Sequence, residues 1–253
     1  MIFDSHAHYL SERFDGDREE LLSEVLGSGV CGIIECATDA RTIEASVSFA
    51  MAHDGVYCAL GVHPHSADEY SDELEKRIEE LIQNEKAIAI GEIGLDYHYD
   101  FHPRELQKEV LSRQIRLAKR LGLPVILHSR ESTADMMEIL ENENADNGVM
   151  HCFSGSVETA QQLLDMGLYI GVGGSLTFKG AVKGIEVVKM LPMERLLLET
   201  DAPYLTPVPF RGERNDSRYI RYVADMIAGI KGVSAQKVTD IACDNAKRLF
   251  GIK

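Results

Sequence analysis

Short runs of apolar residues recur along the chain, and longer, more polar stretches separate them. Most of the runs are only a few residues long and rich in leucine or β-branched residues, which is typical of strands buried on both faces of a parallel sheet. They predict eight strands. The runs are MIF at 1–3, CGIIECA at 31–37, VYCALGV at 56–62, AIAIGEIGL at 87–95, PVILH at 124–128, GVMHCF at 148–153, LYIGVGG at 168–174 and RLLLET at 195–200.

The stretches between the runs have helical spacing. The clearest one predicts a helix from Pro103 to Gly122, because proline suits a helix start, glycine suits its end, and the apolar residues share one face. Strands that alternate with helices predict an α/β protein, a single TIM-type (β/α)₈ barrel domain over residues 1–253. A doubly wound open sheet is the main alternative. Further helices are predicted at 17–28, 39–52, 69–84, 156–166, 216–231 and 234–250.

Six side chains of metal-ligand type mark the carboxyl ends of different runs. In a barrel these ends meet on one face, where catalytic groups gather. Residues two apart on a strand point the same way, so the first two histidines can grip one ion. Imidazole and carboxylate ligands together suit one or two ions such as zinc or manganese better than magnesium. The six residues are His6, His8, Glu92, His128, His151 and Asp201.

Other polar residues near the expected rim carry weaker signals. His63 follows the third run and is a candidate ligand, a partner of a substrate phosphate or a strand cap. Arg130 and Arg211 are candidate substrate contacts, whereas His65 is expected on the loop surface. The glycines of VGGS at 172–175 fit neither common phosphate-loop pattern, so we interpret them as tight turns.

The charge of the chain limits how it can hold a nucleic acid. With 26 Lys and Arg against 41 Asp and Glu, the formal charge is −15. That charge argues against a broad phosphate-coating surface, although a phosphate-bearing substrate can still bind at one metal-loaded pocket. No signal-peptide pattern is seen, and no run reaches the roughly 18 apolar residues of a membrane helix. Because the five cysteines lack CxxC spacing, we expect reduced core thiols in a cytoplasmic protein without membrane contact.

At these motifs the chain resembles the TatD family of metal-dependent deoxyribonucleases, within the amidohydrolase-like metal hydrolases. The resemblance runs nearly from end to end, and several of the motifs are long. They are DSHAHY at 4–9, GVHPH at 61–65, IGEIGLDY at 90–97, LPVILHSR at 123–130, MHCFSGS at 150–156, TFKGA at 177–181, LLLETDAPYLTP at 196–207, RGERND at 211–216 and NAKRLF at 245–250.

The resemblance implies a site for two divalent ions (zinc, magnesium or manganese), with Glu92 bridging them. It implies that Asp201 also accepts a proton from the attacking water, and that His63 contacts a substrate phosphate. The segments DYHYD and RGERNDS depart from the family pattern, which leaves the substrate preference open. The implied ligands are His6, His8 and Asp201 for one ion, and His128 and His151 for the other.

We therefore expect a hydrolase that cleaves phosphodiester bonds with a metal-bound hydroxide. The expected partner is DNA, and the expected activity is that of a 3′–5′ exonuclease on single-stranded or damaged DNA. We expect a role in DNA repair. The protein is expected to be a monomer or a small homo-oligomer. The same ligands would also serve an amide, lactone or aminoacyl-ester hydrolase, because the same nucleophile attacks a carbonyl. A metal-binding scaffold without turnover is a third, more remote hypothesis.

Overall fold

A computed structural model describes residues 1–252 of the chain. Its strands form one eight-stranded sheet in the order β1-β2-β3-β4-β5-β6-β7-β8, and the strand pairs with a described register are parallel. Since this is the strand order of a (β/α)₈ barrel, the predicted fold class is confirmed. The strands are β1 Ile2–Ala7, β2 Val30–Cys36, β3 Val56–Leu60, β4 Ala87–Asp96, β5 Val125–Arg130, β6 Gly148–Met150, β7 Tyr169–Val172 and β8 Leu196–Leu198.

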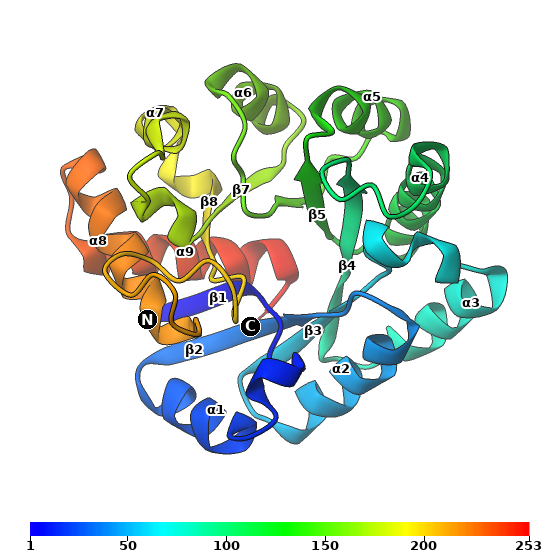
Figure 1. Cartoon of the computed structure of the whole chain (residues 1–253), viewed down its shortest axis with the longest axis horizontal. Helices are drawn as coiled ribbons and strands as arrows, with labels where there is room; N and C mark the ends of the chain where they lie inside the picture. The colour runs from blue at the N-terminus through cyan, green and yellow to red at the C-terminus, as the bar shows by residue number, and fades with distance from the viewer. Residues whose placement is uncertain (253) are drawn as a thin grey trace. The chain divides into compact units, whose positions relative to one another are not determined.

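The helices alternate with the strands along the chain (Figure 1). The α-helices are α1 Arg18–Gly27, α2 Ala40–Ala52, α3 Asp72–Leu81, α4 Arg104–Leu121, α5 Thr133–Glu143, α6 Val157–Asp165, α7 Val182–Met190, α8 Ile220–Lys231 and α9 Ala235–Phe250. Short 3₁₀ helices occupy Glu12–Phe14, Pro64–Glu69, Gly174–Thr177, Met193–Arg195 and Ser217–Tyr219. The helices expected from the sequence are confirmed with small shifts at their ends, whereas α5 and α7 were not among them. Within residues 1–252, no helix is both long and apolar enough to cross a membrane.

The chain folds into two compact units, which are described separately. Unit 1 comprises Met1–Ile34, His151–Asp165 and Tyr169–Lys253. Unit 2 comprises Glu35–Met150 and Met166–Leu168. That residues 1–253 form a single domain stays a prediction.

Unit 2 is built on strands β3 to β6. Strand β4 pairs in parallel with β3 and β5, and all of its residues, Ala87–Asp96, are buried, as a strand covered on both faces requires. Helix α4 packs along β4 (Figure 1). It ends at Gly122, whose φ of 69° is the left-handed conformation that glycine adopts without strain. The carboxyl ends of β3, β4 and β5 are thereby held on a rigid support.

Unit 1 contains β1, β7 and β8. Strands β7 and β8 pair in parallel, and β1 meets the segment after β8 through the bridge between Ala7 and Ala202. Helix α9 packs on β1 and β8, with α8 against it (Figure 1). The Ser234 side chain caps α9 by accepting a hydrogen bond from the Lys237 amide. These contacts bring the carboxyl end of β1 beside the residues that follow β8.

Gln114 offers a test of how α4 fixes unit 2. Its buried amide accepts a hydrogen bond from the Val62 N–H at 2.8 Å and donates one to the Val62 carbonyl at 3.0 Å. We expect Gln114→Leu to lower the free energy of unfolding by about 2 to 4 kcal/mol, because two buried backbone groups lose their partners. Denaturant unfolding measures this loss. The exposed Gln83, changed to Leu, is the matched control and should shift stability by less than about 0.5 kcal/mol. Equal effects of the two substitutions would contradict the expectation.

Candidate functional site

The first cluster of ligand-type side chains lies in unit 1, where β1 ends. His6 and His8 approach each other with their Nε2 atoms 3.1 Å apart. Asp201 Oδ1 lies 3.6 Å from His6 Nε2 and 3.4 Å from His8 Nε2. Two ligand atoms bonded to one ion at about 2.1 Å are separated by about 3.0 to 3.4 Å. The three donors therefore fit a divalent ion, as their chemistry and convergence predict. His6 is part of β1 itself, since the strand extends to Ala7, beyond the apolar run at 1–3.

His151 lies against this cluster. Its ring stacks on the His6 ring with centroids 3.8 Å apart and planes at 14°. Glu199 Oε1 is 3.7 Å from His151 Nδ1 and accepts a hydrogen bond from the Cys152 amide. Burial raises the pKa of Glu199 to about 7, although the nearby His151 opposes this shift. Glu199 was not predicted from the sequence, and its carboxylate faces His151.

A buried carboxylate supports the first cluster from below. Asp4, on β1, accepts hydrogen bonds from the Thr200 amide at 3.0 Å, the Thr200 hydroxyl at 2.6 Å and the Ser217 hydroxyl at 2.6 Å. Burial raises the pKa of Asp4 to about 6, against these donors, which lower it. Through Thr200 the network fixes the turn that presents Asp201, whose φ of 57° is left-handed. Such strained backbone at a site persists only where its surroundings hold it.

The second cluster lies in unit 2, at the carboxyl ends of β3, β4 and β5. Glu92 Oε1 lies 2.9 Å from His128 Nδ1 and 3.6 Å from His63 Nε2. All three side chains are buried or half-buried, and their donor atoms converge as those of a metal site do. Both Glu92 and His128 were predicted as ligands, and unit 2 brings them together.

A hydrogen bond at Nδ1 of His63 helps to distinguish a metal ligand from a phosphate contact at this residue. The His65 amide donates to His63 Nδ1 at 3.1 Å, so Nδ1 carries the lone pair. In the neutral ring the proton is then on Nε2, the atom that faces Glu92. A nitrogen that carries a proton is a donor and not a metal ligand. The tautomer thus favours the interpretation of His63 as a phosphate contact over that of a third ligand.

Asp96 links two histidines beneath the second cluster. Its Oδ2 lies 3.4 Å from His128 Nε2 and 2.8 Å from His65 Nε2. Burial alone would raise the pKa of Asp96, but hydrogen bonds from His128, the Tyr99 amide and His65 hold it well below its usual value. The prediction that His65 is loop surface is wrong, because it is half-buried and bonded to Asp96. Carboxylates that bond the far nitrogen of a ligand histidine fix its orientation.

The pKa of His128 depends on the two carboxylates beside it. Burial lowers its pKa, but the neighbouring carboxylates of Asp96 and Glu92 outweigh that effect and raise the pKa to about 9. Asp4 and Asp96 were missed by the sequence interpretation. A signal was present, since strand side chains repeat every second residue, which puts Asp4 with His6 and Asp96 with Glu92.

The two candidate arginines lie on aromatic rings. The Arg130 guanidinium is 4.9 Å from the centroid of Tyr99, in unit 2. The Arg211 guanidinium is 3.8 Å from the centroid of Phe178, in unit 1, and donates to the Thr206 carbonyl at 3.3 Å. Their contact with substrate stays a prediction.

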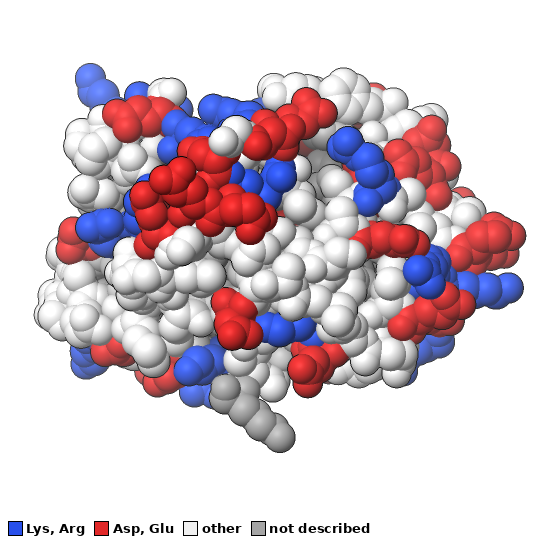
Figure 2. Space-filling view, turned by 90° about the horizontal axis from the view of Figure 1, so that it is seen from below, with Lys and Arg blue, Asp and Glu red and all other residues white. Residues whose placement is uncertain are grey.

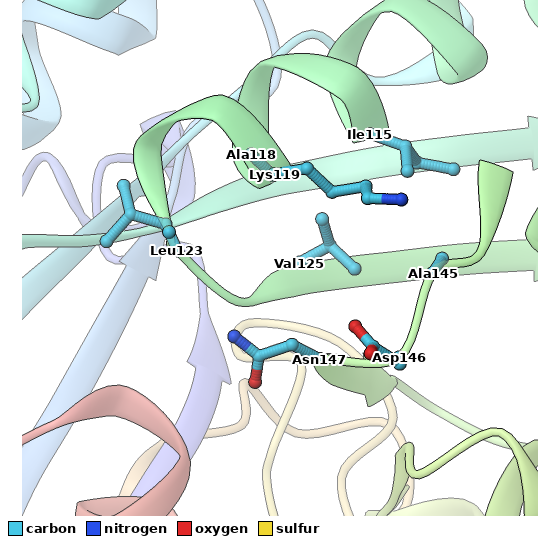
Figure 3. A pocket seen from close by; sticks show the side chains of 9 residues that line it. Ile115, Ala118, Lys119, Leu123, Val125, Ala145, Asp146 and Asn147 are labelled. Carbon is cyan, nitrogen blue, oxygen red and sulfur yellow. The ribbon is translucent and has the colours of Figure 1, made fainter.

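A cavity of about 210 Å³ lies in unit 2, where the amino ends of β5 and β6 meet the end of α4 (Figure 3). Figure 3 shows Ile115, Leu123 and Val125 around it, with the polar Lys119 and Asp146 at its sides. None of the candidate ligands lines it, and it opens at the opposite strand ends from the second cluster. The cavity is therefore remote from the chemistry of the two clusters.

Comparison with known proteins agrees with this chemistry. The family described as TatD related DNase matches residues 3–251. The chain is 45% identical over 254 residues to an uncharacterized metal-dependent hydrolase of Bacillus subtilis, YabD, with 100% of both chains covered. It is 32% identical over 258 residues to the 3′-5′ ssDNA/RNA exonuclease TatD of Cronobacter sakazakii, covering 98% of this chain and 97% of that one. The crystal structure of YjjV, a TatD homolog from Escherichia coli K12, superimposes with a TM-score of 0.93 at 34% identity, covering 100% of this chain and 98% of that one.

We expect Asp96→Asn to weaken metal binding at the second cluster by about 10- to 100-fold, because the amide cannot hold the His128 ring as the carboxylate does. Titration of metal-free protein against a fluorescent chelator measures the affinity. Asp68→Asn is the matched control, since this exposed carboxylate also pairs with a histidine, His102, at 3.2 Å, outside the cluster. Unchanged affinity in the Asp96 variant would show that this carboxylate does not support a metal ligand.

Proposed function

The chain belongs to the TatD family of metal-dependent hydrolases, and on that premise we propose that it is a deoxyribonuclease that removes nucleotides from the 3′ ends of single-stranded DNA. The observation that carries the proposal is the convergence of His6, His8 and Asp201 on one point. The name of the Cronobacter relative, a 3′-5′ ssDNA/RNA exonuclease, supports the choice of substrate.

Two groups of side chains would hold the divalent ions. His6, His8 and Asp201 would hold one ion, and Glu92 and His128 would contribute to a second. When bound, such ions make water a stronger nucleophile and neutralise charge on a phosphoryl group. That Glu92 bridges the two ions and that His151 is a ligand stay predictions.

Asp201 is suited to accept the proton of the attacking water. Burial raises its pKa, but a hydrogen bond with His8 and the charges of His6, His8 and His151 outweigh this effect and lower it. Asp201 is therefore ionised at neutral pH and able to act as a base. The Nε2–H of His63 is suited to donate a hydrogen bond to a phosphate oxygen, because its Nδ1 is occupied by the His65 amide.

The surface charge favours cleavage at an end. Figure 2 shows Asp and Glu side chains interspersed among the Lys and Arg side chains on the face it displays. With a formal charge of −15, an extended track for DNA phosphates is not expected. End-directed cleavage needs few phosphate contacts beyond the reacting nucleotide.

The first test is removal and return of the metal. We expect activity on 5′-labelled single-stranded DNA to disappear in chelator-stripped protein and to return with one or more of zinc, manganese and magnesium, because the nucleophile depends on the ion. The same samples should be assayed with amide, lactone and aminoacyl-ester substrates. Faster turnover of these than of DNA would replace the nuclease proposal with the carbonyl hydrolase. Full activity in protein that elemental analysis shows to be metal-free would overturn the metal mechanism.

The second test concerns Asp201. We expect Asp201→Asn to lower kcat by about 10² to 10⁴-fold, because the amide keeps the shape of the side chain but cannot accept a proton. Steady-state kinetics measures this loss, and circular dichroism together with metal content checks that fold and ions survive. Asp216→Asn, at a carboxylate bonded to Arg218, is a control near in sequence. A residual kcat above roughly a tenth of wild type would remove Asp201 from the role of base.

A further inference from the structure

We propose that Tyr99 and Phe101, here called the aromatic pair, form a platform on which a nucleobase of single-stranded DNA stacks beside the second cluster. The proposal rests on the proposed nuclease function and adds to it a binding site for the base. Tyr99 is 50% exposed and Phe101 is 62% exposed, which is unusual for large aromatic side chains. Single exposed apolar residues are common, but these two rings are also held in place by their neighbours.

The aromatic pair has a fixed orientation. The two rings stack on each other with centroids 5.4 Å apart and planes at 19°. The His65 ring braces both of them edge-on, with its centroid 5.3 Å from that of Tyr99 and 4.8 Å from that of Phe101. Rings that are already ordered lose little conformational freedom when a base stacks on them. Exposed aromatic rings held in this way are the feature that single-strand binding proteins use.

The same contacts tie the aromatic pair to the second cluster. His65 Nε2 lies 2.8 Å from Asp96 Oδ2, the oxygen that also faces His128. The Tyr99 amide donates to Asp96 Oδ1 at 3.0 Å. One carboxylate therefore orients a predicted metal ligand and anchors the loop that carries the platform. A base on the aromatic pair would belong to a nucleotide whose phosphate lies near the ion.

Arg130 completes the chemistry of a nucleotide site. Its guanidinium lies 4.9 Å from the Tyr99 centroid, and the side chain is exposed. Among the described residues it has no carboxylate within ion-pair distance. Arg104 differs, because it lies 4.2 Å from the Tyr97 centroid but is paired with Asp100 at 3.3 Å. An uncompensated cation beside two exposed aromatic rings suits a phosphate next to a base, and a base is available for stacking only in a single strand.

The test uses the metal-loaded full-length protein and two 5′-labelled oligonucleotides that differ only at the 3′ end, where one has a normal terminal nucleotide and the other an abasic one. We expect the double variant Tyr99→Ala and Phe101→Ala to raise KM for the normal end by about 5- to 100-fold, the range expected for one lost stacking contact. For the abasic end, KM should match that of the wild type within about twofold, because there is no base to stack.

Three further variants separate stacking from structure. Tyr99→Phe combined with Phe101→Tyr keeps both rings and should restore wild-type KM. Phe101→Leu keeps an apolar side chain without a ring and should lose affinity for the normal end only. Met51→Ala, at an apolar residue of unit 2 that is 63% exposed and remote in sequence, should change neither substrate. Metal content and thermal unfolding must match those of the wild type throughout.

The outcomes of these assays distinguish failure of the platform from failure of the nuclease function. Equal losses on normal and abasic ends, or no loss on either, would overturn the platform while leaving the nuclease function intact. Oligonucleotide binding that depends on the aromatic pair, measured by fluorescence anisotropy but without cleavage in any metal, would overturn the nuclease function and retain the platform. A wild-type protein that neither binds nor cleaves single-stranded DNA would overturn both.

Discussion

A carboxylate buried away from water must find donors, and this requirement shapes the ends of the strands in both units. In unit 1 the residue concerned is Asp4, which is fully buried and takes its donors from Thr200 and Ser217. Those donors come from segments roughly 200 residues further along the chain, so their alignment with β1 follows from satisfying one charge. Thr200, held by Asp4, is followed directly by Asp201, which lies beside His6 and His8.

The same requirement organises unit 2 around Asp96. The Gln107 side chain accepts a hydrogen bond from the Asp96 amide at 2.9 Å. The Asp96 side-chain oxygens bond the Tyr99 amide and His65, and one of them lies 3.4 Å from His128 Nε2. A candidate ligand histidine and the loop that carries the proposed platform thus share one anchor. Because the partners belong to different elements, changing the carboxylate affects all of them together, and their effects should not be additive.

Much of the fold and of the candidate site could be predicted from the sequence, because the signals for them lie within short segments of the chain. The apolar runs identify strands because parallel strands bury both faces, and α4 is long and well terminated. Helix α7 lacks such signals: it has nine residues, contains Gly184 and has no side-chain cap. The residues at the carboxyl ends of the strands could be recognised as candidate ligands by their type. The tautomer of His63 could not be predicted, because it depends on where the His65 amide points. Nor could the burial of His65 be foreseen, since it results from a partner 31 residues away.

The candidate metal ligands and the loop beside them would have different roles, activation of water for the former and recognition of the substrate for the latter. Imidazole and carboxylate ligands would make a bound water reactive, and they would serve a phosphate ester and a carbonyl compound equally well. Discrimination between those substrates must come from groups that contact the rest of the molecule. In unit 2 the groups proposed for this contact are Tyr99, Phe101 and Arg130, and the Tyr99 amide is held by Asp96. The segment DYHYD, where the chain departs from the family pattern, contains part of that loop. Because this segment also contains Asp96, a change there would affect both the proposed base contact and the support of His128.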